Sequence, residues 1–450
     1  MSDNISKDDY VENVTDLDSI GYIPEIRVGV GGNVDAGKTT TISVITKDAI
    51  DNGRGSARKL IMTHPHEIES GRTSDISHAF LRNENSTINF IDLAGHEKYF
   101  KTTVRGMNGY SVNIACVIIN ANTGIQMMTK EHITLILSLK IPFFIIYTKI
   151  DSTPKNILER NLGNIQKHIK NKLKKTYLLV TDENRDELEH TYHSHNIVPV
   201  FPISNIGDVD DKDSGKIKNY LNGIKGCGLQ NLKDYIRNIT PIIPPLDKIN
   251  THANMVVDRT YQIHGIGLVI SGVVKTGMIK KGDTKLLGPF HDKYHKVIIK
   301  SIHNNFRESV DVIYAGQSCC INIRSITTKV EIKKKQIRRG FRLLDINKEK
   351  VFREFTAQVT IVHHPTTITT KYEPSINCGP ISQTVKIIDI NKLNSKEDEN
   401  GISKKILRSR DKAIVRFRFK FRPEYIEVGT RFTFREGSTR GFGNIIEIFE

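Results

Sequence analysis

The chain has 450 residues, of which 38% are hydrophobic and 26% charged, so each of about three domains can bury a core. Its 66 Lys and Arg against 50 Asp and Glu give a formal net charge of +16, which is typical of proteins that meet a polyanion. The sign alone does not separate RNA, DNA and an anionic membrane. A proteome-wide lysine bias is the alternative explanation.

Several classes of protein are disfavoured by the remaining composition. The five cysteines are odd in number and form no C-x-x-C pair, which argues against a disulfide framework and a zinc site. The N-terminus lacks the basic and apolar regions of a signal peptide. The longest apolar runs, such as 141–147, fall far short of the roughly 20 residues of a membrane span. We expect a soluble, cytoplasmic monomer that no membrane segment anchors.

The first half of the chain alternates between strand and helix patterns. Residues 1–24 are acidic and poor in apolar side chains, which predicts a flexible tail. Apolar helical spacing is found at 129–140, after Asp151 and after Gly228. The alternation predicts one α/β domain over residues 25–243. Continuous apolar runs, typical of parallel strands, are found at 26–30, 86–92, 114–120, 143–148 and 197–201.

The pattern changes after the Pro-rich linker at 240–245. Short alternating β-branched segments with Gly-rich turns and almost no helical period follow. They predict two antiparallel β-barrels, one over 250–346 and one over 350–450. The polar stretch 391–411 is predicted to be a loop between strands.

A glycine-rich motif joins the first predicted strand to the following helix. It reads Gly32-x-x-x-x-Gly37-Lys38-Thr39, the spacing of a phosphate-binding P-loop in the context that the motif requires. Glycines let backbone N–H groups close around phosphate oxygens, and the helix N-terminus adds positive potential. Lys38 is predicted to reach the β- and γ-phosphates, and the Thr39 hydroxyl to ligate Mg²⁺.

Three later motifs, each at a predicted strand end, narrow the nucleotide to GTP. At 92–95, the Asp92 carboxylate is predicted to hold Mg²⁺ through water and Gly95 to offer its N–H to the γ-phosphate. At 148–151, the Asp151 carboxylate can accept guanine N1–H and N2–H, a pair that adenine does not offer. At 204–205, a backbone N–H can meet guanine O6. The order of the four motifs predicts a GTPase rather than an ATPase.

With these motifs, the sequence resembles the translational GTPases of the elongation factor Tu and elongation factor 1-alpha class, through residues 34–40 and 92–97. It resembles still more closely the GTP-binding protein 1 and 2 subfamily, and this resemblance covers roughly residues 25–448. The subfamily-like segments are 51–58, 66–74, 363–368, 422–425 and 434–440.

The resemblance implies a P-loop GTPase domain followed by two antiparallel β-barrels, with two switches that respond to the γ-phosphate. It implies that Thr73 is a Mg²⁺ ligand, that His96 orients the attacking water, and that Asp35 holds a monovalent cation. The residues predicted to bind GTP or GDP are Asn33, Val34, Asp35, Ala36, Gly37, Lys38, Thr39, Thr40, Gly95, Thr148, Lys149, Asp151, Ser204 and Asn205.

Three residues depart from the elongation factor pattern. Asn33 stands where a histidine is usual. Arg72 stands where an apolar gate residue is usual, which leaves Val34 alone in that gate, while Arg72 is free to contact phosphate or the ribosome. Thr148 replaces the usual asparagine, so guanine selection is expected to depend more on Asp151.

A candidate polyanion surface lies in the last barrel. From Val415 to Arg422, basic residues alternate with apolar ones, so a strand would present the basic side chains on one face. This face is either solvated or a row of phosphate contacts that Arg435 and Arg440 extend. In the elongation factor class the second barrel helps to hold the T arm of tRNA, which favours phosphate contacts.

The functional hypothesis is therefore a translation elongation factor-like GTPase that uses GTP and Mg²⁺ and acts with the ribosome and with tRNA or another RNA. The alternative is a GTP-switched adaptor in RNA surveillance or decay. A scaffold that does not hydrolyse GTP ranks last, because Lys38, Thr39, Asp92 and His96 are all present.

Overall fold

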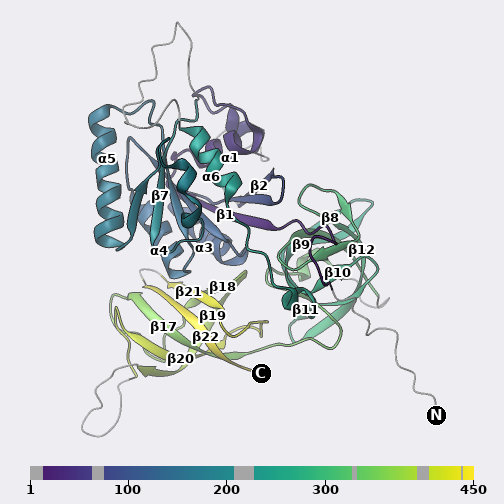
Figure 1. The fold of residues 1–450 in the computed structure, drawn as a ribbon. Helices are drawn as coiled ribbons and strands as arrows, with labels where there is room; N and C mark the ends of the chain where they lie inside the picture. Colours follow the sequence, from purple (N-terminus) through teal and green to yellow (C-terminus); the bar gives the residue numbers. More distant parts are fainter. Residues whose placement is uncertain (1–13, 63–75, 207–227, 327–331, 393–404, 437–438) are drawn as a thin grey trace, which may run out of the picture.

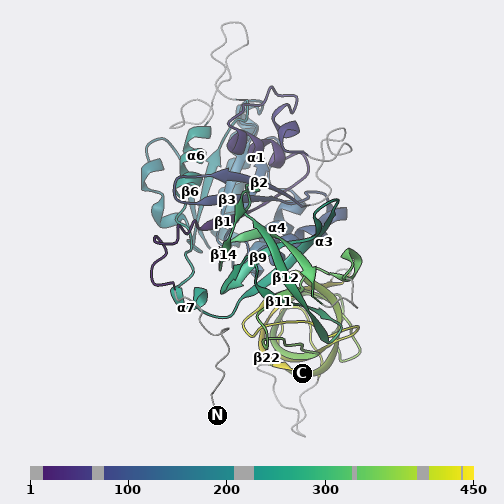
Figure 2. The ribbon, with the colours of Figure 1, turned by 90° about the vertical axis from the view of Figure 1, so that its right-hand side faces the viewer.

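The computed structural model describes residues 14–62, 76–206, 228–326, 332–392, 405–436 and 439–450. It consists of an α/β domain, here called the G domain, that lies against two β-barrels (Figures 1 and 2). This is the predicted fold class, which is confirmed. In the described part of the chain, no helix is long and apolar enough to cross a membrane.

The G domain is built on a seven-stranded sheet with the order β2-β3-β1-β4-β5-β7-β6. All neighbours are parallel except β2 and β3, which are antiparallel. The two edge strands β2 and β6 are absent from the predicted set, because edge strands are short and half-buried and carry no continuous apolar run. The strands are β1 Glu25–Gly32, β2 Ser77–Arg82, β3 Thr87–Asp92, β4 Ile114–Asn120, β5 Phe143–Thr148, β6 Thr176–Leu179 and β7 Ile197–Pro202.

Helices cover both faces of this sheet, which explains why its central strands are apolar throughout. On one face α1 and α6 pack into one core, and on the other face α3, α4 and α5 pack into a second core. The helices are α1 Lys38–Lys47, α3 Phe100–Gly109, α4 Met127–Ser138, α5 Lys155–Lys167 and α6 Leu229–Asn238. Shorter helical turns are η1 Ala57–Leu60, η2 Glu97–Tyr99, η3 His168–Lys172, η4 Arg185–Glu187, η5 Glu189–Thr191, α7 Leu246–Ile249 and η6 Lys334–Gln336.

The first barrel follows α7. Its strand order is β11-β16-β8-β9-β15-β12-β13, and pairing of β11 with β12 closes the ring around an aliphatic core. A separate two-stranded sheet joins β10 to β14. The strands are β8 Asn254–Ile263, β9 Gly267–Thr276, β10 Met278–Lys280, β11 Thr284–Phe290, β12 Lys293–His303, β13 Ser309–Val310, β14 Val312–Tyr314, β15 Ser318–Ser325 and β16 Arg342–Leu344.

The second barrel is closed in the order β17-β20-β19-β18-β21-β22. Alternate residues of its strands face a core rich in phenylalanine. Part of the predicted loop 391–411 lies outside the described residues. The strands are β17 Glu354–His363, β18 Ser375–Cys378, β19 Ile381–Lys392, β20 Lys412–Phe419, β21 Arg431–Glu436 and β22 Thr439–Phe449.

The predicted flexible tail needs a correction. Its residues 1–13 lie outside the described part, but residues 14–24 pack against the first barrel. Val14 and Asn250 exchange two hydrogen bonds of 2.8 Å, and the Tyr22 hydroxyl donates to the Ala315 carbonyl oxygen at 2.9 Å. The acidic composition concealed Val14, Leu17 and Ile20, whose side chains join a small apolar cluster with the barrel.

Both barrels are tied to the G domain through partly buried polar contacts. Glu25 at the start of β1 accepts hydrogen bonds of 2.8 Å from the N–H and from the hydroxyl of Ser318 in the first barrel. Glu131 on α4 forms ion pairs with Arg435 at 3.4 Å and with Arg440 at 2.8 Å in the second barrel. The position of the G domain on the barrels therefore depends on elements that lead directly to the predicted nucleotide site.

Candidate functional site: the P-loop and the strand ends around it

The four predicted motifs meet at the carboxyl edge of the sheet, at the ends of β1, β3, β5 and β7. Hydrogen bonds join them. The Thr39 hydroxyl donates to Asp92 Oδ2 at 2.6 Å, the Thr148 hydroxyl to the Ala36 carbonyl oxygen at 2.7 Å, and Asn205 Nδ2 to Thr41 Oγ1 at 2.9 Å. Segments up to 164 residues apart in the sequence thus form one site, at the edge where ligands bind in open α/β sheets.

The loop after β1 has the backbone conformation of an anion cradle. Gly32 and Gly37 have φ values of 145° and 90°, which side chains rarely permit. A Cβ on Gly32 would also come within 2.4 Å of the Ile118 carbonyl oxygen. Among the described residues, no side chain caps the N-terminus of α1 at Gly37. The first N–H groups of α1 therefore suit a phosphate group.

Lys38 lies at the first turn of α1 and is buried. Its Nζ donates to the Asn33 carbonyl oxygen at 2.9 Å. Burial lowers its pKa, and the nearby Asp92 and Asp35 carboxylates oppose that shift. A Cβ on Gly95 would collide with Lys38 Nζ, so the Asp92–Gly95 motif approaches the loop as closely as a glycine allows.

The donor set for a divalent cation is present at the same place. Thr39 Oγ1 and Asp92 Oδ2 are two hard oxygen ligands of the kind that Mg²⁺ prefers. A residue pair already at hydrogen-bond distance fits a cation bound directly by the hydroxyl and through water by the carboxylate. Thr73 and Arg72, which complete the predicted switch, lie outside the described residues.

Thr148 connects the end of β5 to the P-loop. Its buried hydroxyl donates to the Ala36 carbonyl oxygen, a contact that the sequence analysis did not foresee. Directly after it, Lys149 adopts a φ of 62°, and its carbonyl oxygen accepts the Thr153 hydroxyl at 2.7 Å. These contacts fix the short loop that carries Asp151.

His96 lies on the surface beside the site. It caps the turn η2, because its Nδ1 accepts the Lys98 N–H at 3.1 Å, and its ring meets the edge of Tyr99. The Thr103 hydroxyl donates to the Ala94 carbonyl oxygen at 2.9 Å and anchors the segment just before it. His96 therefore follows a rigid strand end, but its side chain is engaged in a local cap.

The sequence analysis assigned no individual role to two residues of the site, although Asp51 lies in the subfamily-like segment 51–58. Asp51, 7% exposed, accepts the N–H groups of Gly53 and Ala57 at 3.0 and 2.9 Å, and its own N–H donates to the Asn205 carbonyl oxygen. This folds the loop after α1 against the segment that follows β7. The glycines that follow Asp51 could have indicated a functional loop, but an ordinary turn has the same glycine-rich sequence.

The second is His132 of α4, which is completely buried. Its Nδ1 accepts the Gly32 N–H at 2.8 Å, and its ring stacks on Phe100 of α3 at 5.6 Å. Burial, with a smaller effect of Lys38, lowers its pKa to about 3, so the ring is neutral and Nδ1 remains an acceptor. No sequence signal separates such a histidine from an ordinary core residue.

The predicted basic strand is largely neutralised. Arg416 and Arg418 on β20 both pair with Glu354, with Arg416 Nε 2.8 Å and Arg418 Nε 2.6 Å from its oxygens. Arg435 and Arg440 do not extend this row, because both face Glu131 of the G domain. The sequence of β20 alone does not reveal this pairing, because the carboxylate comes from a neighbouring strand.

Comparisons with known proteins agree with this geometry. The family described as "Elongation factor Tu GTP binding domain" matches residues 24–244, and "Elongation factor Tu C-terminal domain" matches residues 348–449. GTP-binding protein 1 of Xenopus laevis is 35% identical, and the match covers 95% of the chain and 64% of that protein. GTP-binding protein 2 of Homo sapiens is 31% identical, with 94% and 69% covered. The chain thus spans less than two thirds of the Xenopus protein.

A solved structure is similar over nearly the whole chain. Translation elongation factor SelB from Methanococcus maripaludis, in complex with the GTP analogue GPPNHP, superposes with a TM-score of 0.64 at 20% identity. The similarity covers 95% of the chain and 79% of SelB. At this identity it supports the three-part fold and nothing finer.

The Thr148 contact makes a first prediction. Thr148→Val removes the hydroxyl from Ala36 and should weaken GDP binding by about 1 kcal/mol, roughly 5-fold. Thr148→Asn, which restores a donor, should return the affinity toward wild type. Both are measured by titration with a fluorescent GDP analogue. Wild-type affinity in the valine variant would show that the contact does not shape the site.

His132 makes a second prediction, in the pH dependence of stability. A histidine whose pKa falls on folding stabilises the fold above the unfolded-state pKa, near 6.5, and loses this effect as the pH falls toward the folded value. Between pH 6.5 and 4, the free energy of unfolding measured in urea should therefore fall further for wild type than for His132→Asn. The difference should be at most about 3 kcal/mol. Parallel pH profiles would contradict the buried neutral ring.

Proposed function

The chain belongs to the family of translational GTPases related to elongation factor Tu, and we propose that it binds GTP and hydrolyses it to GDP and phosphate. We further propose that it acts in the cytoplasm as an elongation factor-like protein with tRNA and the ribosome. The observation that carries the proposal is the meeting of four strand ends around one P-loop, held by Thr39–Asp92 and Thr148–Ala36.

In this proposal one part of the site binds the phosphates of the nucleotide and another part binds its guanine base. The residues from Asn33 to Thr40 surround the phosphates, with Lys38 as the charged donor and the N–H of Gly95 toward the γ-phosphate. Asp35 is the proposed partner of a monovalent cation. Asp151 accepts from guanine, Lys149 lies along the base, and a backbone N–H at Ser204–Asn205 donates to O6.

Hydrolysis needs positioning more than covalent chemistry from the protein. Lys38 and the backbone N–H groups stabilise the negative charge that develops on the phosphate oxygens. Mg²⁺, when bound by Thr39, Thr73 and, through water, Asp92, neutralises part of that charge. His96 orients the attacking water. Because His96 caps η2 at the surface, we expect turnover to be slow until a partner redirects its side chain.

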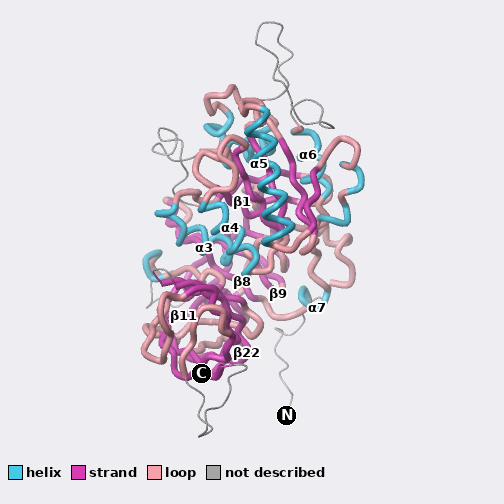
Figure 3. Tube along the Cα trace, turned by 90° about the vertical axis from the view of Figure 1, so that its left-hand side faces the viewer, coloured by secondary structure: helices cyan, strands magenta, loops and turns pink. Residues whose placement is uncertain are grey.

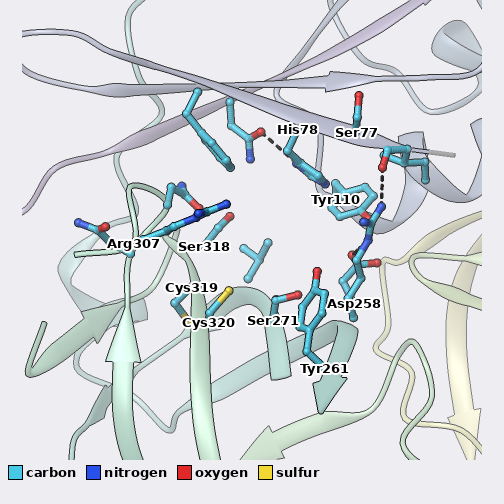
Figure 4. A pocket seen from close by; sticks show the side chains of 18 of the residues that line it. Ser77, His78, Tyr110, Asp258, Tyr261, Ser271, Arg307, Ser318, Cys319 and Cys320 are labelled. Carbon is cyan, nitrogen blue, oxygen red and sulfur yellow. Dashed lines mark hydrogen bonds and ion pairs between the residues drawn. The ribbon is translucent and has the colours of Figure 1, made fainter. Parts of the chain in front are cut away.

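A cavity between the G domain and the first barrel supports a role in RNA handling (Figure 4). It measures about 390 Å³, within the range of small-ligand sites. His78 and Tyr110 line it from the G domain, and Tyr261, Arg307 and Ser318 from the barrel. An aromatic ring beside several hydrogen-bonding groups suits an unstacked nucleotide. We propose that it receives the terminal part of a bound tRNA.

The test is GTP turnover by the full chain with and without ribosomes. We expect ribosomes to accelerate turnover at least 10-fold, and His96→Ala to reduce the accelerated rate at least 10-fold with little change in GTP affinity. His190→Ala, an exposed histidine of the same domain, is the matched control and should behave as wild type.

Two outcomes would redirect the proposal. Turnover indifferent to ribosomes, together with GTP-dependent capture of RNA or protein, would favour the adaptor in RNA surveillance or decay. Unchanged turnover in His96→Ala would remove the catalytic role of that residue.

A further inference from the structure

The long helix α5 lies on one outer face of the G domain (Figures 1 and 3). Its apolar side, with Leu158 and Ile165, is buried against the sheet. Beyond Lys167 the chain continues through the wider turn η3 and reaches β6. The exposed lysines along this stretch are Lys167, Lys170, Lys172 and Lys174, here called the α5 lysines.

Other elements bring further cations to the same place. Lys130 lies on α4 and Lys140 lies between α4 and β5, and both are exposed. After burial, Lys172 and Lys130 are the groups that lower the pKa of His168. Burial, then Lys175, Lys140 and Arg431, lowers the pKa of His195. Lys130 therefore lies near Lys172 around His168, and Lys140 lies near Lys175 and Arg431 around His195.

Carboxylates do not balance these cations. Glu159, the acidic residue within α5, pairs with Lys155 at the other end of the helix at 3.9 Å. Glu131 beside Lys130 is taken by Arg435 and Arg440. Within the part of the chain that the structure describes, neither the α5 lysines nor Lys130 and Lys140 form an ion pair. The arginines of β20, by contrast, are paired.

Helix stability explains only part of the pattern. Lysines in a last helical turn interact favourably with the helix dipole, an effect of about 0.3–1 kcal/mol each. That account covers Lys167 and the residues of η3. It does not cover Lys130 or Lys140, which belong to other elements.

We propose that the α5 lysines, together with Lys130 and Lys140, bind the phosphate backbone of an RNA. Residues 127–206 are all described, and Met127, one helical turn before Lys130, is their one exposed large hydrophobic side chain. A single apolar side chain is too little for the core of a protein interface or for the anchors of a membrane surface, so both fit poorly. Dispersed lysines without aromatic neighbours suit sequence-independent contacts to phosphates.

This surface is separate from the nucleotide site. α5 rises about 1.5 Å per residue, so Lys170 lies roughly 20 Å from the loop that carries Asp151. The inference therefore does not depend on hydrolysis, and a variant of the α5 lysines leaves the P-loop untouched. Failure of RNA binding and failure of GTP turnover can be told apart.

The experiment measures binding of the full chain to a fluorescein-labelled, unstructured 20-nucleotide RNA by anisotropy over a range of KCl concentrations. One variant combines Lys170→Glu, Lys172→Glu and Lys174→Glu. The matched control combines Lys333→Glu, Lys334→Glu and Lys335→Glu, three exposed lysines of the first barrel, with the same change in net charge. A milder variant replaces the same α5 lysines with glutamine. Wild-type GDP affinity verifies that each variant is folded.

We expect the α5 variant to bind RNA at least 10-fold more weakly than wild type at 100 mM KCl. The glutamine variant should lose less of its RNA affinity. The slope of log affinity against log salt should fall by about 2, since each contact to single-stranded RNA contributes about 0.7. The control should change less than about 3-fold. Equal losses in both charge reversals would overturn the assignment. The same titration with poly-L-glutamate tests an acidic protein partner. If the α5 variant lost binding to poly-L-glutamate and kept its binding to RNA, the assignment would also be overturned.

Discussion

The shape of the P-loop is fixed from outside the loop, and the rest of the site depends on this constraint. His132 accepts the Gly32 N–H at one end, the Thr148 hydroxyl holds Ala36 in the middle, and Asp92 accepts the Thr39 hydroxyl at the other end. Each partner comes from a different element of the sheet or its helices. A cradle ordered in advance binds phosphate without the entropic cost of assembling it, and its N–H groups already point in a fixed direction.

The same elements connect the site with the barrels. His132 stacks on Phe100, and the Arg435 guanidinium also lies over the Phe100 ring, 4.5 Å from its centroid. Arg435 also pairs with Glu131, the residue before His132. The first barrel is connected through β1. This strand begins with Glu25, which accepts a hydrogen bond from Ser318, and it ends at the P-loop. The P-loop is therefore connected to each barrel through a few packed and hydrogen-bonded residues.

The fold and the meeting of the four motifs at one edge of the sheet could be predicted because they depend on local patterns. Strands buried on both faces are apolar throughout, and a P-loop needs glycine and lysine at set spacings, as at Gly37 and Lys38. The remaining features arise between distant residues. The packing of Val14 on the first barrel, the pairing of Arg416 with Glu354 and the use of Thr148 as a tether depend on neighbours that one strand or tail does not reveal. His132 is one buried histidine among apolar residues, and only its partner Gly32 distinguishes it.

The central claim is that the four strand ends form a site selective for guanine nucleotides. Isothermal titration of the wild-type chain with GDP, GTP and ATP in the presence of Mg²⁺ tests it most directly. The account predicts binding of GDP and GTP, with ATP at least about 100-fold weaker because adenine lacks the two N–H groups that Asp151 accepts, a loss of roughly 3 kcal/mol. Comparable affinities for ATP and GTP, or no binding of any of the three, would contradict it.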